Sequence, residues 1–157
     1  MTAQDAVLRS GVDRCRRIVA GVEELHPFLA NVLPVQDDDL ARLPVVQRIA
    51  SIALLKRFEQ LQDMLGRLVR TLLSWTGEDV RELTRRDVAN WMERLRLVET
   101  SDDWLDLTGL RNRLVHEYPI NEIEQVDRVN ECWVAMPRLV TIFDAVQAYL
   151  AKQGFIA

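Results

Sequence analysis

Three long segments of this chain carry apolar residues at alternating steps of four and three positions. The first such stripe extends from Leu8 to Leu29, the second from Leu54 to Trp75 and the third from Val126 to Leu150. This spacing follows one side of an α-helix, and no segment alternates apolar and polar residues with the period of a β-strand. The pattern predicts an all-α fold, an antiparallel helical bundle of four to six helices in one domain over residues 1–157.

Capping residues and glycines predict where these helices begin and end. The second long helix is expected over about residues 45–74, with Gly77 as its stop. Shorter helices are expected to begin after Thr84 and at Ser101. Asn121, with an acidic residue three positions later, is expected to cap the last helix.

The charge balance limits the kinds of ligand that the chain can attract. The 24 acidic residues outnumber the 20 basic ones, for a formal net charge of -4. This balance argues against a general cationic coat for nucleic acid, so any RNA contact is expected to come from local arginines, namely Arg111 and Arg113 aided by Arg85 and Arg86. The two histidines and two cysteines have no close spacing, which argues against a metal site.

The chain shows no sign of a membrane or secreted protein. No run of 18 apolar residues exists, so we expect no membrane span. The first five residues lack the basic and apolar regions of a signal peptide, and two cysteines do not make a disulfide framework. We therefore expect a cytoplasmic protein.

One segment, residues 105–118, is not explained by core packing alone. On a helical wheel one face is apolar and consists of Leu107, Leu110, Leu114 and Tyr118. The opposite face carries Leu105, Gly109, Asn112 and His116. Arg111 lies on the flank between the two faces. A glycine inside a helix costs about 1 kcal/mol relative to alanine, and close approach of a second backbone would offset this cost. We expect this face to contact a second subunit or a ligand.

The polar residues of this segment suit a particular chemistry. Histidine acts as a general acid or base near neutral pH, and arginine offers a fork of donors that matches phosphate oxygens. With no serine or cysteine nucleophile among them, these groups suit RNA cleavage by the RNA's own 2′-OH. Arg111 and His116 are five positions apart, so their side chains diverge by about 140°. Two copies of the helix across a two-fold axis would hold one phosphate better than a single copy.

The string from Arg111 to Tyr118 resembles the signature of the HEPN superfamily, in which arginine is followed after four to six residues by histidine. Its longer form, Arg-x4-His-x-Tyr, is similar to the HepT toxins of MNT–HEPN toxin–antitoxin pairs, and Arg111, His116 and Tyr118 fill all three positions. Asn112 occupies the place of the polar residue that often follows the arginine. The order of the expected elements also agrees, because HEPN domains are all-α with a long helix after the motif.

The resemblance implies an activity, a regulation and partners. HEPN toxins are metal-independent endoribonucleases without a cofactor, and they act as homodimers in which two motifs form one cleft. Carried over, His116 is the general acid/base, Arg111 binds the phosphate, and Asn112 orients them. The face with Leu105, Gly109 and Asn112 is then the dimer interface. The expected partners are RNA and a minimal nucleotidyltransferase antitoxin that adds AMP to Tyr118 and silences the nuclease.

Two other functions remain open from the sequence. Arg57, Phe58 and Glu59 resemble a second HEPN branch, the non-catalytic substrate-binding or scaffold subunits of nucleotidyltransferases. A helical interaction module, in which His116 is only an interface residue, is the third possibility. A buried core position is the simpler interpretation of Phe58.

Overall fold

The computed structural model describes residues 2–36 and 40–156, and within those residues helices joined by loops are the only regular secondary structure. This confirms the predicted all-α class. The α-helices are α1 (Ala3–Leu29), α2 (Val45–Trp75), α3 (Arg85–Arg94), α4 (Ser101–His116) and α5 (Glu122–Lys152). A short 3-10 helix, η1 (Leu40–Arg42), precedes α2.

The helix ends follow the capping residues of the sequence. Thr84 and Thr100 each accept a hydrogen bond from the backbone of an aspartate three positions later, and that aspartate accepts one in return. Asn121 accepts from the backbone N–H of Glu124 at the start of α5. Gly77 follows α2 with φ of +95°, a conformation that glycine adopts without strain. The expected starts and stops are thus confirmed.

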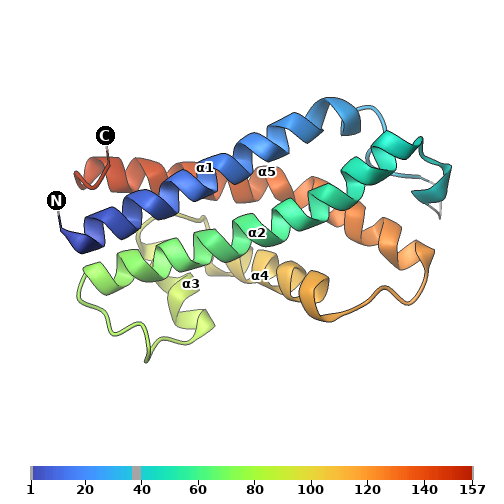
Figure 1. The fold of residues 1–157 in the computed structure, drawn as a ribbon. Coiled ribbons are helices and arrows are strands. Elements are labelled where there is room, and N and C mark those ends of the chain that lie inside the picture. The colour runs from blue at the N-terminus through green and yellow to red at the C-terminus, as the bar shows by residue number, and fades with distance from the viewer. Residues whose placement is uncertain (1, 37–39, 157) are drawn as a thin grey trace.

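The long helices lie side by side and set the position of the shorter ones. Figure 1 shows α1 and α2 running in opposite directions along the length of the molecule, with α5 behind them. α4 runs beside α2 in the opposite direction, and α3 packs against α4 near the end of α2. α4 therefore contacts α2, α3 and α5, and its remaining side is uncovered.

A single cluster of apolar side chains runs between the helices. It includes Phe58, which is fully buried, so this residue belongs to the core as its simpler interpretation predicts. Cys15 and Cys132 are free thiols in the same core. Within the described residues, no helix combines the length and the apolar character that crossing a membrane requires.

Candidate functional site

α4 has a buried side and an uncovered side, as the helical wheel predicts. Leu107 and Leu110 are buried in the core, whereas Gly109 and His116 are exposed. A Cβ atom built on Gly109 would meet no atom of this chain within 4 Å. We call the uncovered side, with Leu105, Gly109, Asn112 and His116, the open face of α4. It has room for the backbone of another molecule.

Arg111 is held at the edge of this face by two hydrogen bonds. Its Nη2 donates to Oδ1 of Asp63 on α2 at 3.2 Å, and its Nη1 donates to Oδ1 of Asn112 at 3.1 Å. Its Nε is buried and has no hydrogen-bond partner among the described residues. The side chain is 25% exposed, so part of the guanidinium group still reaches solvent. Asn112 thus orients the arginine beside the open face.

A cationic pocket of about 190 Å³ opens beside Arg111. Its charged lining residues come from three helices: Asp63, Arg67 and Arg70 of α2, Arg85 of α3, and Arg111 of α4. We call this hollow the arginine pocket. Oδ2 of Asp63 also forms an ion pair with Nη2 of Arg67 at 3.2 Å. Trp104 lies against Gly66 at the floor of the pocket and is buried, so its ring is a packing surface.

His116 is the last residue of α4 and is not among the residues that line the arginine pocket. Its side chain is exposed and has no hydrogen-bond or ion-pair partner among the described residues. Five positions of helix separate it from Arg111 by about 7.5 Å along the axis and about 140° around it. One copy of the chain therefore does not bring the two side chains to one phosphate.

Tyr118 stands in the loop after α4 and is 95% exposed. The helical wheel places it on the core side, but α4 ends at His116, so the wheel does not extend to this residue. Arg128 of α5 fixes the loop because its Nη1 donates to the backbone oxygen of Glu117 and its Nη2 to Oε1 of Glu124 at 3.0 Å. The Tyr118 side chain is therefore held in a fixed loop and exposed to solvent.

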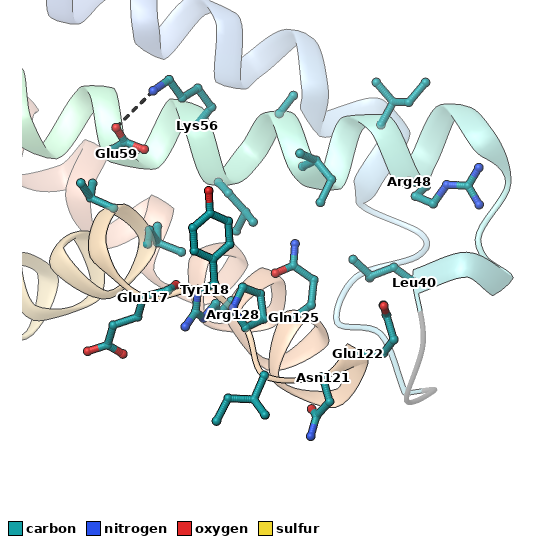
Figure 2. A pocket seen from close by; sticks show the side chains of 18 of the residues that line it. Leu40, Arg48, Lys56, Glu59, Glu117, Tyr118, Asn121, Glu122, Gln125 and Arg128 are labelled. Atoms are coloured by element: carbon teal, nitrogen blue, oxygen red, sulfur yellow. Dashed lines mark hydrogen bonds and ion pairs between the residues drawn. The ribbon is translucent and has the colours of Figure 1, made fainter.

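The Tyr118 ring stands in a groove of about 1190 Å³ between α2, the 117–121 loop and α5 (Figure 2). Exposed apolar side chains line it, notably Ile49 and Ile52 of α2 and Ile120 of the loop. Lys56 and Glu59 form an ion pair at 3.1 Å on its rim. We call this hollow the Tyr118 groove.

The residues expected at a dimer interface divide between two hollows. Leu105 and Gly109 line a groove between α4 and α5 together with the exposed Val134. Asn112 lines the arginine pocket on the other side of α4. The open face is thus a ridge of α4 between two concave surfaces.

Two of the arginines expected to aid RNA contact lie in ion pairs with carboxylates. Arg113 pairs with Glu131 of α5 at 2.6 Å, and Arg86 pairs with Asp102 at 2.8 Å. Each guanidinium group lies beside a carboxylate of a neighbouring helix and stays partly exposed, so its contact with RNA stays a prediction.

α2 contributes residues to this site that the motif on α4 does not include. Asp63, Arg67 and Arg70 are spaced by four and three, like the apolar stripe of the same helix but on another side of it. A charged stripe with helical spacing was therefore present in the sequence. Only the fold shows which helices this charged stripe faces.

Comparison with known proteins gives no relative from which a role can be carried over. No family model, curated protein or solved structure matches this chain significantly. The functional assignment therefore depends on the residues of the site and on the resemblance of its motif.

Proposed function

We propose that the chain is a metal-independent endoribonuclease toxin of a toxin–antitoxin pair that acts as a homodimer. The observation that carries this proposal is the arrangement of α4. Its exposed His116 and its oriented Arg111 are an acid/base and a phosphate ligand, and both adjoin a face with room for a second backbone. This is the motif that resembles the HEPN signature.

The reaction needs no group beyond the RNA and these side chains. The 2′-oxygen attacks the neighbouring phosphorus, and the bond from phosphorus to the 5′-oxygen breaks. One product ends in a 2′,3′-cyclic phosphate, and the other begins with a 5′-hydroxyl. Histidine at position 116 transfers a proton to or from these oxygens, and Arg111 stabilises the negative charge on the phosphate.

The divergence of the two side chains within one copy is the reason for the dimer. If two α4 helices meet through their open faces, Arg111 of one protomer and the partner's His116 reach the same phosphate. A two-fold axis places two such Arg/His pairs in one cleft, because isologous interfaces repeat every contact. The glycine at position 109 permits the close approach of the helices.

The exposed Tyr118 supports the proposed regulation by adenylylation. A nucleotidyltransferase partner reaches its hydroxyl without unfolding the loop, since the side chain is 95% exposed. The added AMP brings a phosphate and a base next to the site, and its negative charge competes with RNA for nearby arginines. The Tyr118 groove offers an apolar surface to either the adenosine or the partner.

A second function is favoured by one observation. Arg111 is already paired with Asp63, so a non-catalytic subunit that presents a substrate to a nucleotidyltransferase would use this arginine as a structural link between α2 and α4. In that case Arg111→Ala would lower the free energy of unfolding, and the wild type would cleave no RNA.

An RNA cleavage assay in excess EDTA separates the two functions. We expect wild type to cleave RNA and leave a 2′,3′-cyclic phosphate. His116→Ala should lower the rate by about 10² to 10⁴, the range for loss of a positioned acid/base. Arg111→Ala should also fail to cleave RNA. Arg111→Lys should fail as well, since the point charge of lysine does not replace a guanidinium fork. Full activity of His116→Ala, or strict dependence on Mg²⁺, would contradict the mechanism.

A further inference from the structure

The arginine pocket concentrates positive charge in a chain that is acidic as a whole. Four guanidinium groups and one carboxylate line it, which leaves three net positive charges. The chain as a whole has a formal net charge of -4. The pocket is therefore a local anion-attracting site, of the kind that an acidic protein needs in order to hold a polyanion.

The positive charge in this pocket is only partly compensated by the groups around it. Arg85 has no ion-pair or hydrogen-bond partner among the described residues. Arg67 shares Asp63 with Arg111, and Nε of Arg111 is unpartnered. Several arginines outside the pocket instead have a carboxylate of their own, in the pairs Arg86–Asp102, Arg113–Glu131 and Arg138–Asp103. The pocket thus retains unused donors for an incoming anion.

The size of the pocket indicates what part of a ligand enters it. Its volume of about 190 Å³ is below the roughly 300 Å³ at which small-molecule sites begin. A phosphate group fits such a space, and a whole nucleotide does not. Arginine forks match phosphate oxygens with two parallel hydrogen bonds. Trp104, the aromatic residue of the pocket, is buried and offers no face for a base to stack on.

We propose that the arginine pocket binds a backbone phosphate of the RNA strand adjacent to the phosphate that is cleaved. This inference rests on the proposed nuclease function and names a part of its substrate site. Arg111 belongs to both subsites, because Asn112 holds its Nη1 beside the open face while the same side chain lines the pocket. A strand that crosses Arg111 from the open face enters the pocket toward Arg85 on α3.

This subsite gives the enzyme affinity without base recognition. Phosphate contacts position a nucleic acid but carry no sequence information. Each contact releases counterions, so the affinity decreases with salt. Loss of Arg85 should therefore weaken the binding of every single-stranded RNA to a similar extent and raise KM more than it changes kcat.

The test compares two adjacent arginines that carry the same charge. Arg85 lines the pocket, whereas Arg86 pairs with Asp102 outside it. Arg85→Gln and Arg86→Gln are each made in the His116→Ala background, so that the RNA stays intact. The dissociation constant of a labelled oligouridine is then measured by fluorescence anisotropy at several salt concentrations, after circular dichroism has verified the helical fold. AMP is titrated in parallel.

We expect Arg85→Gln to weaken binding about tenfold at low salt, the size of one lost hydrogen bond to a charged group. The slope of log K against log salt should fall by about 0.7, the value for one phosphate contact on a single strand. Arg86→Gln should bind as the parent does. The subsite is overturned if the two variants bind RNA equally, if the parent binds no RNA, or if AMP binds as tightly as RNA.

The result of this binding experiment can be distinguished from the result of the RNA cleavage assay. If wild type does not cleave RNA but binding depends on Arg85, the nuclease function is wrong and the pocket remains a phosphate site for RNA. If wild type cleaves RNA and Arg85→Gln behaves like Arg86→Gln, only the subsite is wrong.

Discussion

Asp63 of α2 accepts a hydrogen bond at 3.2 Å from Arg111 of α4, across 48 positions of the sequence. The other carboxylate oxygen of Asp63 forms an ion pair with Arg67, also at 3.2 Å. The carboxylate thus positions the arginine of the motif and at the same time offsets part of its charge. An RNA phosphate that binds Arg111 must compete with Asp63 for the guanidinium group.

Asp63→Asn should therefore strengthen RNA binding. The amide keeps an oxygen that accepts from Arg111 but removes the competing charge. Since the pair is partly exposed, we expect the dissociation constant to fall roughly twofold to fivefold. Anisotropy in the His116→Ala background measures this change. Asp13→Asn, which removes an exposed carboxylate of α1 paired with Arg16, is the matched control. Equal affinities of the two variants would show that Asp63 does not compete with RNA.

Gly109→Leu should produce a monomer that is still folded. A Cβ atom at this exposed position meets no other part of the chain, so we expect the larger side chain to obstruct the approach of a second α4 and to leave the fold intact. Light scattering should give the mass of a dimer for wild type and of a monomer for this variant. Gly109→Ala is the control, because it should stay dimeric and gain up to about 1 kcal/mol of helix stability. A dimeric leucine variant would place the interface elsewhere.

Much of the fold follows from local patterns in the sequence. The steps of four and three predict the long helices, Thr84 predicts where a short helix begins, and Asn121 predicts where the last long helix begins. The two sides of α4 also follow from spacing alone. These features depend on neighbours within one or two turns, so a helical wheel captures them.

The arginine pocket is a different case, because its residues come from three helices. The sequence shows that Arg67 and Arg70 share a side of α2, but the packing of α3 and α4 decides what they face. The same holds for Arg113, which pairs with Glu131 across a helix interface. The wheel places Tyr118 toward the core side, but the end of the helix before Pro119 allows the side chain to turn outward, and it is exposed in the structure.

Tyr118→Phe should keep its fold and escape adenylylation. The hydroxyl is the proposed acceptor of AMP, and the exposed ring makes few packing contacts that the substitution alters. Intact-mass measurement after incubation with ATP, Mg²⁺ and the partner nucleotidyltransferase should show one or more added AMP groups on wild type alone. Tyr149→Phe changes the other tyrosine of the chain and should be modified normally. Equal modification of Tyr118→Phe would exclude this residue as the acceptor.

The buried thiols should make the protein less stable at alkaline pH. Burial raises the pKa of Cys15 to about 12, and burial together with the charge of Glu131 raises the pKa of Cys132 to about 12. The pKa of a cysteine thiol in the unfolded chain is about 8.5. Above that pH the native state binds more protons than the unfolded state, so the free energy of unfolding falls as pH rises toward about 12.

Urea unfolding at about pH 8 and about pH 10 measures this effect. We expect the difference between the two pH values to be smaller in the double variant Cys15→Ala/Cys132→Ala than in wild type. The comparison removes the contribution of other groups that titrate in the same range. An unchanged difference would mean that the two thiols titrate alike in the folded and unfolded chains.

The central claim is that Arg111 of one protomer and the partner's His116 act on the same phosphate. It predicts which mixed dimers are active. A dimer of one Arg111→Ala chain and one His116→Ala chain keeps one complete Arg/His pair, although each variant alone is inactive. A dimer of one wild-type chain and one chain with both substitutions keeps none. If each site lay within one chain, the two results would be reversed.

The most direct measurement is the RNA cleavage rate of these two mixed dimers. The two chains of a dimer carry different affinity tags, and purification through both tags in turn isolates the mixed dimer. The account predicts about half of the wild-type rate for the dimer of single variants, because one of the two Arg/His pairs related by symmetry is intact. It predicts background activity for the dimer of wild type with the double variant. Activity in the second dimer and none in the first would contradict the composite site.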